Sequence, residues 1–406
     1  MTPQSENLDK IISFSLMSFV CFSFFSISLT QISCGVGGLA WMAKCYLTRS
    51  CGEQVFPLKV PFLLFVLACL VAVVGAVDFL GSYKSLKRLL EILIFFWAVN
   101  CIKNEDMRER LSLLLIIAAT LSTLTGFYAA WENGITLASR YENGVPVSNR
   151  AEGTMSVYMT YAGILMLAFL VVTGKLVFAP KEKKWLYVPI ILLGFCILLT
   201  FTRQAWLGVV VGVIFLIWSR KKSLLWFLPV VLGIIFLASP VNIKQRINSL
   251  IDFKDNNLVI RMALWQGGWL IFKDYPIIGC GFKCVDVINQ DYPDPTGYIK
   301  KLRGMHSNFI QLAVDTGLFG LVSWISIWVV YFMTLYQRLN SMQGNLAYRR
   351  DAMASAAACI GFLVAGFFET NFYDSEVSML LYFIMALPFT GTQSPDREDN
   401  MQNPSN

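Results

Sequence analysis

The sequence predicts an all-α polytopic membrane protein, and three observations carry that prediction. The 406 residues are 56% hydrophobic and only 15% charged, whereas soluble domains carry about 25% charged residues. The mean hydropathy is +0.58. Apolar runs recur along the chain at close to the length that a helix needs to cross a bilayer, about 20 residues. Together these features argue against a large soluble helical protein, whose apolar residues fall in shorter patches.

Twelve stretches are apolar enough to predict membrane spans, although several of them are short. We expect the turn between the first two at the small and polar residues from Gln31 to Gly38. A single span over this region is the alternative, and it would invert the orientation of all that follows. The twelve stretches are Ile11–Leu29, Cys34–Leu47, Val60–Leu80, Leu89–Ile102, Leu111–Trp131, Met155–Phe178, Trp185–Phe201, Trp206–Trp218, Leu224–Ser239, Phe309–Tyr336, Ala352–Phe368 and Val377–Phe389.

Basic residues decide the orientation, because short cytoplasmic loops of membrane proteins are enriched in Lys and Arg. With twelve spans and both ends inside, nearly every short inside loop is basic, whereas the short outside connections carry fewer basic residues, among them Lys84, Lys87, Arg88, Arg140 and Arg150. The inside set comprises Arg49, Lys59, Lys103, Arg108, Arg110, Lys175, Lys181, Lys183, Lys184, Arg220, Lys221, Lys222, Arg338, Arg349 and Arg350.

This orientation divides the chain into four parts. Residues 1–239 hold nine spans, residues 240–305 form a large outer loop, and residues 306–391 hold the last three spans. Residues 392–406 form a polar tail on the cytoplasmic side, with the composition of a disordered segment. A loop as long as 240–305 is more than a connector, so we expect it to have a function of its own.

The outer loop contains one helical stripe of apolar residues. Leu258, Met262, Trp265, Trp269 and Phe272 follow one another at spacings of four and three, which predicts an amphipathic helix. Such a helix lies in the interface at the outer face of the membrane, or it packs against the neighbouring spans. The pattern fits both arrangements.

Cysteine usage and net charge remove several classes of function. Four cysteines (Cys21, Cys69, Cys196, Cys359) lie in apolar stretches, where they behave as small hydrophobes. Cys280 and Cys284 are close together in the outer loop and could form a disulfide. A single histidine and the lack of C-x-x-C argue against a metal site.

The net charge of +7 reflects basic loops, because no Lys/Arg stripe with interleaved aromatics suggests nucleic acid. The N-terminal residues are not basic and no clear cleavage site follows the first apolar run. We therefore expect a membrane anchor there and not a cleaved signal peptide.

Three ionisable residues at membrane depth are functional candidates, because such groups are costly in a bilayer. Arg203 lies between two apolar runs, although a snorkelling arginine at a helix end is equally consistent with its position. Arg261 lies beside the apolar stripe of the outer loop, where a solvated surface charge is the ordinary alternative. His306, the only histidine, lies at the entry of the tenth span, and a helix N-terminus also favours anions. Asp315 follows about 13 Å further into that span, where it orients the site or faces a wet cavity.

These residues match a known family in order and spacing. Arg203 with Leu207 resembles the R-x3-L motif of O-antigen ligases, and His306-Ser307 with Gly317 resembles their H-[NSQ]-x9-G motif. The wider pattern is similar to the O-antigen ligase and polymerase superfamily with its Wzy-C-type domain, and it covers roughly residues 140 to 340. It comprises Arg150–Thr154, Arg261–Trp265, Asp274–Phe282, His306 and Gly317–Gly320.

The resemblance implies a GT-C-like fold and a glycosyltransferase of the bacterial inner membrane with its site facing the periplasm. It implies transfer of a glycan from undecaprenyl pyrophosphate to a lipid A-core sugar hydroxyl in lipopolysaccharide biosynthesis, without ATP, metal or cofactor; membrane lipids surround the enzyme. His306 is then the base that activates the hydroxyl, since histidine titrates near neutrality. Arg203 and Arg261 stabilise the pyrophosphate with bidentate donors. Arg150 and Asn308 complete the substrate-binding set.

Other functions remain open from the sequence. The nearest is an O-antigen polymerase, which differs only in its acceptor; a protein O-oligosaccharyltransferase is a further relative, although those chains usually carry another periplasmic domain. A lipid-linked glycan transporter would place charges at the membrane midplane, and an assembly scaffold would not need the arginines and histidine together. If His306 is only a helix-entry residue, the site is expected around Asp315, Glu369 and Asp374.

Overall fold

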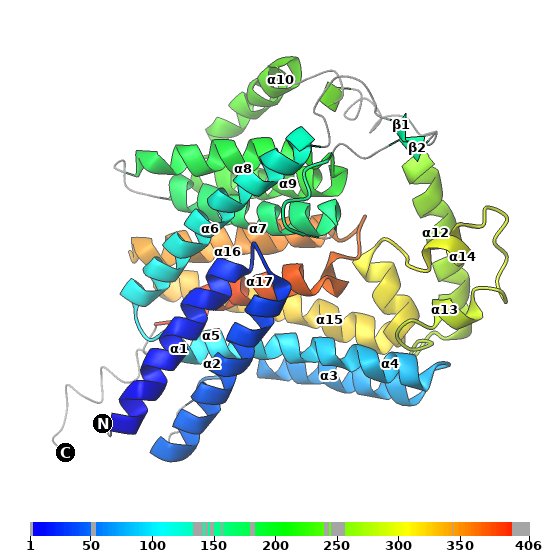
Figure 1. Cartoon of the computed structure of the whole chain (residues 1–406), viewed down its shortest axis with the longest axis horizontal. Helices are drawn as coiled ribbons and strands as arrows, with labels where there is room; N and C mark the ends of the chain where they lie inside the picture. Colours follow the sequence, from blue (N-terminus) through cyan, green and yellow to red (C-terminus); the bar gives the residue numbers. More distant parts are fainter. Residues whose placement is uncertain are drawn as a thin grey trace.

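The molecule is a bundle of long helices that lie side by side along its longest axis (Figure 1). This computed structural model describes residues 3–49, 54–132, 141–142, 145–146, 150–155, 157–178, 183–238, 243–244, 256–342 and 344–391. The only strands among these residues are β1 (Tyr141–Glu142) and β2 (Val145–Pro146), which pair antiparallel. The all-α prediction is therefore confirmed in its essentials.

The first half of the chain supplies the helices that flank the bundle. They are α1 (Pro3–Phe22), α2 (Ile27–Thr48), α3 (Lys59–Val74), α4 (Phe79–Ser85), the 3₁₀ helix η2 (Leu86–Glu91), α5 (Ile92–Cys101), α6 (Glu105–Glu132), α7 (Tyr158–Val177), η3 (Lys184–Leu186) and α8 (Tyr187–Leu199).

The second half supplies the remaining helices and the small ones of the outer segment. They are α9 (Arg203–Arg220), η4 (Lys222–Phe227), α10 (Leu228–Ala238), α12 (Asn256–Asp274), α13 (Val285–Ile288), α14 (Tyr298–Leu302), α15 (Asn308–Ser341), α16 (Leu346–Ala365), η5 (Asn371–Tyr373), α17 (Ser375–Ala386) and η6 (Leu387–Phe389).

Each of the twelve predicted apolar stretches is mostly helical where the structure describes it, but Ile11–Leu29 and Val60–Leu80 each contain a turn and several of the helices are short. Among the described residues, four helices are long and apolar enough to cross a membrane: Glu105–Trp131, Tyr158–Val177, Arg203–Arg220 and Asn308–Ser341. Shorter apolar helices cover Lys59–Val74, Lys184–Leu199, Lys222–Ile234 and Ser375–Phe389. The architecture is that of a multi-pass helical membrane protein, and the count of twelve spans stays a prediction.

The predicted turn between the first two spans is wrong in position, although two helices are present. The chain turns at Ser23–Ser26, and residues Gln31 to Gly38 lie inside α2. Ser26 is the N-cap of α2 and accepts a hydrogen bond from the Leu29 amide, which fixes the helix start. Gly37 of α2 serves packing, since a methyl group there would lie 2.3 Å from the Trp97 ring.

The centre of the bundle is formed by α7, α16 and α17. From Val377 to Ala386 every residue of α17 is buried, and α7 is apolar on all sides, as expected for a central helix. Small residues let the central helices approach closely: a methyl group at Gly208 of α9 would lie 2.6 Å from the Gly361 carbonyl oxygen of α16. This small-residue contact is typical of helix packing in membranes.

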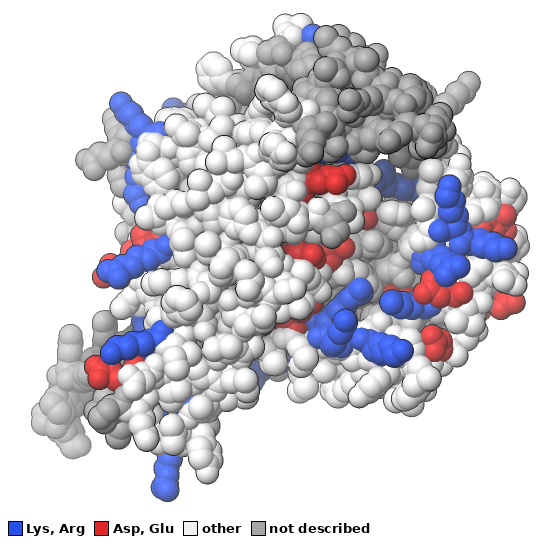
Figure 2. Space-filling model, in the orientation of Figure 1, with Lys and Arg blue, Asp and Glu red and all other residues white. Residues whose placement is uncertain are grey.

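The long helices connect two ends of the bundle. We call the end where α7, α9 and α15 begin the outer end, and the end where α6 and α16 begin the inner end, after the predicted orientation. Figure 2 shows charged side chains towards both ends of this face and a broad uncharged zone between them. Basic residues predicted for the inner side do gather at one end, as the ion pairs below show.

The outer segment contains the predicted amphipathic helix, α12. Its buried face, however, is formed by Leu264, Gly267, Gly268 and Ile271, and the predicted stripe is only partly covered; Met262 and Trp269 are exposed. The helix thus packs on α15 and also presents apolar side chains outward. Residues 239–242 and 245–255 of the predicted loop, and the tail 392–406, lie outside the described residues.

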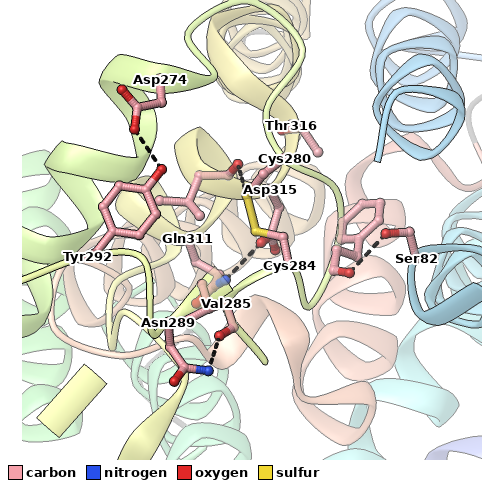
Figure 3. The surroundings of a disulfide bond; sticks show 12 residues. Ser82, Asp274, Cys280, Cys284, Val285, Asn289, Tyr292, Gln311, Asp315 and Thr316 are labelled. Carbon is pink, nitrogen blue, oxygen red and sulfur yellow. Dashed lines mark hydrogen bonds between the residues drawn. A yellow bond between two sulfur atoms is a disulfide. The ribbon is translucent and has the colours of Figure 1, made fainter. Parts of the chain in front are cut away.

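A break in α15 joins the outer segment to the bundle. Gly317 has φ 64° and ψ −166°, which interrupts the helix one turn and a half beyond Gln311. The segment Pro276–Gly281 fills the break: the amides of Cys280 and Gly281 donate to the carbonyls of Val314 and Asp315, and those of Leu318 and Phe319 donate to Pro276 and Ile277. Cys280 and Cys284 form a disulfide at this junction (Figure 3).

Candidate active site

His306 lies at the outer end, directly before α15. Ser307 is the N-cap of the helix, and His306 takes a left-handed backbone conformation with φ 45°. The residue before it is held firmly, because Met305 is fully buried, its amide donates to Gln311 and its carbonyl accepts from the Trp265 indole. A non-glycine residue with positive φ costs free energy, so the surrounding contacts must impose this conformation.

The loop between α16 and α17 supplies the partner of His306. The imidazole Nδ1 lies 3.2 Å from Glu369 Oε1, and the His306 side chain is 26% exposed while that of Glu369 is 9% exposed. The other carboxylate oxygen accepts from Gln204 Nε2 at 3.1 Å, and Oε1 also accepts from the Thr370 amide. Glu369 is therefore fixed by three groups and orients the imidazole.

Asn308 holds this loop in place. Its backbone amide donates to the carbonyls of Gly366 and Glu369, and its side-chain amide bridges Asn371 and the Phe372 amide. The side chain is completely buried, so both of its polar atoms are engaged in the loop. These contacts show that Asn308 positions the loop, and the substrate contact expected from the sequence stays a prediction.

Arg203 begins α9 at the same end of the bundle. It is half-buried and is followed directly by Gln204, whose side chain contacts Glu369. The preceding Phe201 has φ 52°, so the chain enters α9 through a left-handed residue as it enters α15. The Arg203 and His306 motifs, about a hundred residues apart in the chain, are thus joined through Gln204 and Glu369.

Arg261 reaches the site through α12. It lies one turn before Trp265, and residues four apart share a helix face. Trp265 donates to the Met305 carbonyl at 3.1 Å, and its ring centre lies 6.0 Å from that of Phe368, the residue before Glu369. Arg261, half-buried, is therefore on the face of α12 that covers the His306 loop.

Arg150 is tied to the chain just before Arg203. The Ala151 amide donates to the Leu199 carbonyl at 3.0 Å, and the Arg150 guanidinium lies over the Tyr158 ring at 4.0 Å. A cation held against an aromatic face is partly stabilised and partly shielded from water. The structure thus brings the five sequence-predicted site residues to one end of the bundle, where Asn308 is completely buried and the other four are half-buried.

Asp315 belongs to a neighbouring polar group. It is 1% exposed and accepts hydrogen bonds from Gln311 at 2.9 Å and from the Tyr373 hydroxyl at 2.6 Å. The Arg88 guanidinium lies 5.3 Å from the Tyr373 ring centre. Figure 3 shows Asp315 and Gln311 beside the disulfide, so this group links the outer segment to the Glu369 loop. No described arginine forms an ion pair with Asp315.

The arrangement suits proton transfer to a base. Because Nδ1 faces the Glu369 carboxylate, the tautomer that donates from Nδ1 leaves a lone pair on Nε2. Nε2 can then accept a proton, and Glu369 stabilises the imidazolium that forms. Among the described residues, no three His, Cys, Asp or Glu side chains come together in a way that could hold a metal ion.

The sequence did not predict the partnership of Glu369 with His306. Glu369 was named only as a fallback candidate, and Gln204 and Arg88 were not named as site residues. A weak signal was present, because Glu369 follows the apolar stretch Ala352–Phe368 at its predicted outer end, the same side as His306.

A comparison with protein families finds one match. Residues 188–325 match the family described as O-antigen ligase, a segment of about a third of the chain that contains Arg203, Arg261, His306 and the Gly317 break. Arg150 and Glu369 lie outside the matched segment. No curated protein is similar enough to count as a match. The chain therefore carries an O-antigen ligase-type domain, which extends from α8 into α15.

Proposed function

We propose that the protein is an O-antigen ligase, which transfers a glycan from undecaprenyl pyrophosphate to a sugar hydroxyl of lipid A-core at the periplasmic face of the bacterial inner membrane. The observation that carries the proposal is the His306–Glu369 pair at 3.2 Å, placed where the arginine-bearing segments of an O-antigen ligase-type domain converge. A base beside permanent cations suits attack of a hydroxyl on a glycosyl pyrophosphate.

His306 acts as the base in this proposal. Nε2 takes the proton of the acceptor hydroxyl while the hydroxyl oxygen bonds to the anomeric carbon of the donor. The bond from that carbon to the pyrophosphate oxygen breaks, and the electron pair leaves with undecaprenyl pyrophosphate. Glu369 holds the imidazole in the tautomer that can accept a proton and offsets the positive charge that develops on it.

The arginines act on the leaving group. Charge grows on the pyrophosphate oxygen as the bond breaks, and fixed cationic donors in a site of low dielectric stabilise that charge. Arg203 and Arg261 supply planar bidentate donors, and Arg150 is placed to bind the same group or the adjoining sugar. The pyrophosphate linkage supplies the free energy, so the proposal requires neither ATP nor a nucleotide sugar.

The orientation is part of the proposal. Successive long helices alternate in direction between the two ends: Lys44 near the end of α2 contacts Asp9 near the start of α1, and Thr154 before α7 contacts Phe24 after α1. This alternation supports twelve spans with His306 on the periplasmic side. Single cysteines at Lys301 and Lys222, both exposed, test it with an impermeant reagent on intact spheroplasts. Labelling is expected at position 301 alone, and labelling at 222 alone would overturn the orientation.

Reconstitution with defined substrates tests the reaction. Purified protein should join a glycan from undecaprenyl pyrophosphate to a lipid A-core acceptor in the presence of a chelator and without nucleotide. A lengthened glycan still on its carrier would identify a polymerase, and a glycan moved across the bilayer with no new covalent partner would identify a transporter. A strict requirement for divalent metal or ATP would contradict the mechanism.

A further inference from the structure

The inner end of the bundle contains a network of ion pairs that the proposed reaction does not use. Asp351 of α16 pairs with Arg108 at 2.8 Å and with Lys175 at 2.9 Å, and both Asp351 and Arg108 are almost completely buried. Glu109 of α6 pairs with Lys175, Lys183 and Arg350, each at 2.8 Å. The network connects α6, α7, α16 and the chain before η3.

The charges of this network do not balance. Among the described residues, four basic side chains (Arg108, Lys175, Lys183, Arg350) share the two carboxylates of Glu109 and Asp351, which leaves an excess of two positive charges. Charges removed from water are costly unless they are paired. Lys183, 33% exposed, has three N–H donors, of which one is directed at Glu109. The network can therefore accept a further anionic group.

A cavity of about 470 Å³ lies beside the network. It is lined by Lys175, Lys183, Arg110, Glu109 and Asp106 on its polar side, and by Leu113, Ile116, Trp185 and Leu186 on its apolar side. The cavity lining itself holds three basic and two acidic side chains, so its net charge is +1. The volume falls in the range of small-molecule sites.

A strip of exposed apolar side chains on α6 and α8 leads away from the apolar side of the cavity. On α6 the exposed residues Leu113, Ile117, Leu121 and Leu124 follow one another at helical spacing away from the cavity, over about 16 Å. On α8, which packs against α6, Val188, Ile191 and Phe195 do the same. The Phe127 and Phe195 rings, with centres 5.7 Å apart, join the two helices at the far end of this strip.

We propose that this cavity binds the phosphodiester headgroup of an anionic glycerophospholipid, with an acyl chain along the exposed apolar strip of α6 and α8. The net positive charge of the lining selects a headgroup without a compensating amine, and the apolar strip selects a lipid over a soluble phosphate. Basic pockets between spans on the inner side are known to bind anionic lipids by this chemistry. The inference does not depend on the glycan-transfer reaction.

Native mass spectrometry of the purified full chain tests the site. Mixed micelles would offer phosphatidylglycerol or phosphatidylethanolamine, and the lipid retained by the protein is counted. We expect the wild type to retain phosphatidylglycerol in preference. Lys183→Gln should weaken that retention about tenfold, since one charge-assisted contact is lost. Lys184→Gln, which removes the same charge from the adjacent residue that does not line the cavity, should behave as wild type.

A second cavity variant, an activity control and a competition with phosphate complete the test. Arg110→Gln, at an exposed position of the cavity wall, should weaken retention in the same direction, and it replaces Lys183→Gln if that variant misfolds. Glycan transfer by Lys183→Gln should equal that of the wild type, which separates this test from that of the proposed function. Equal retention of the two lipids, or wild-type retention by both cavity variants, would overturn the proposal. Displacement of the lipid by inorganic phosphate would identify a soluble-anion site instead and overturn the lipid assignment.

Discussion

The two ends of the bundle use charge in opposite ways. At the inner end, six charged side chains from three helices and one loop form several ion pairs, and Asp351 and Arg108 are sealed from solvent. At the outer end, His306 and Glu369 form one pair that remains 26% and 9% exposed. The backbone there contains left-handed residues at Phe201 and His306 and a broken helix at Gly317.

This difference indicates a division of labour along the same helices. α7 and α16 run from one end to the other, and Asp351 lies about 22 Å along α16 from Gly366, where the Glu369 loop begins. Strained or incompletely paired groups persist only where the surrounding structure imposes them, and they cluster at functional sites. The ion pairs of the inner end and the close packing of the central helices provide that support. Variants at the two ends should therefore separate activity from stability.

The largest effect on activity is expected at His306. His306→Ala removes the proposed base and should slow glycan transfer by about 10²–10⁴-fold. The side chain is partly exposed and lies before a helix, so insertion and thermal stability should change little. The measurements are the transfer rate of purified protein and, in cells, accumulation of lipid-linked glycan with loss of glycan-bearing lipopolysaccharide. Wild-type transfer by this variant would reduce His306 to a helix-entry residue and move the search to Asp315, Glu369 and Asp374.

The largest effect on stability is expected at Asp351. Asp351→Asn leaves Arg108 and Lys175 buried with less compensation, and loss of one partner of a buried pair costs about 3–5 kcal/mol. Asp9→Asn is the matched control, because Asp9 pairs with Lys44 and Lys103 at partly exposed positions and such pairs contribute at most about 1 kcal/mol. Thermal unfolding in detergent measures both variants. If Asp351→Asn instead lowers transfer per folded molecule, the inner end takes part in the chemistry.

Substitutions at Arg203 and Arg261 test the leaving-group role proposed for the outer end. Arg→Ala at either position removes donors to the leaving group and should lower transfer about 10²–10³-fold, as loss of one oxyanion donor does in other enzymes. Arg→Lys should restore transfer only in part, because lysine keeps the charge but not the fork of donors. Kinetics of the four variants at equal expression decide the matter. Full transfer by both alanine variants would refute the pyrophosphate role.

A smaller effect is expected for the residue that positions His306. Glu369→Gln keeps a hydrogen-bond acceptor for Nδ1 but removes the negative charge, which should cost about tenfold in kcat/KM. The loss should fall on kcat with little change in KM, because Glu369 contacts the proposed base and not the substrate. A purely structural role for Glu369 would instead lower the yield of folded protein and leave kcat per folded molecule unchanged. Asn308→Asp, which alters the buried support of the same loop, provides the structural comparison.

Much of the fold was predictable because it follows from the hydropathy of the chain and from the helical spacing of its apolar residues. The predicted apolar stretches are mostly helical, since long apolar runs have few alternatives to a helix in a membrane protein. The first turn was misplaced because the glycines in α2 were taken as chain breakers. They are small residues in a helix, and Gly37 makes room for Trp97, a contact 60 residues away in sequence. Pattern alone does not distinguish these two uses of glycine.

The site was predictable only where residues carry local motifs. Arg203, Arg261 and His306 lie in short patterns, and the structure brings their segments together at one end. Glu369 lies outside any motif, and its role depends on a loop that Asn308 fixes from another helix. The inner network was visible only as scattered basic residues, because Arg108, Lys175 and Arg350 meet through helices far apart in the chain. Long-range partners of this kind have no local signal.

The last effect is expected at Asp374, in the loop between α16 and α17, and it concerns how stability depends on pH. Burial raises the pKa of its carboxyl from the ordinary 3.8 to about 7, and the nearby Glu369 and Glu376 add to this shift. The folded protein therefore keeps a proton on Asp374 between these pH values that the unfolded chain has already released. The free energy of unfolding that this group contributes is present below pH 3.8 and is lost as pH rises towards about 7. Asp374→Asn keeps an oxygen that accepts from the Thr160 hydroxyl at 3.0 Å but does not titrate. The variant should match the wild type within about 2 °C in acid and become relatively more stable near neutrality, as thermal scans across this pH range would show. An unchanged pH slope in the variant would mean that Asp374 does not hold this proton.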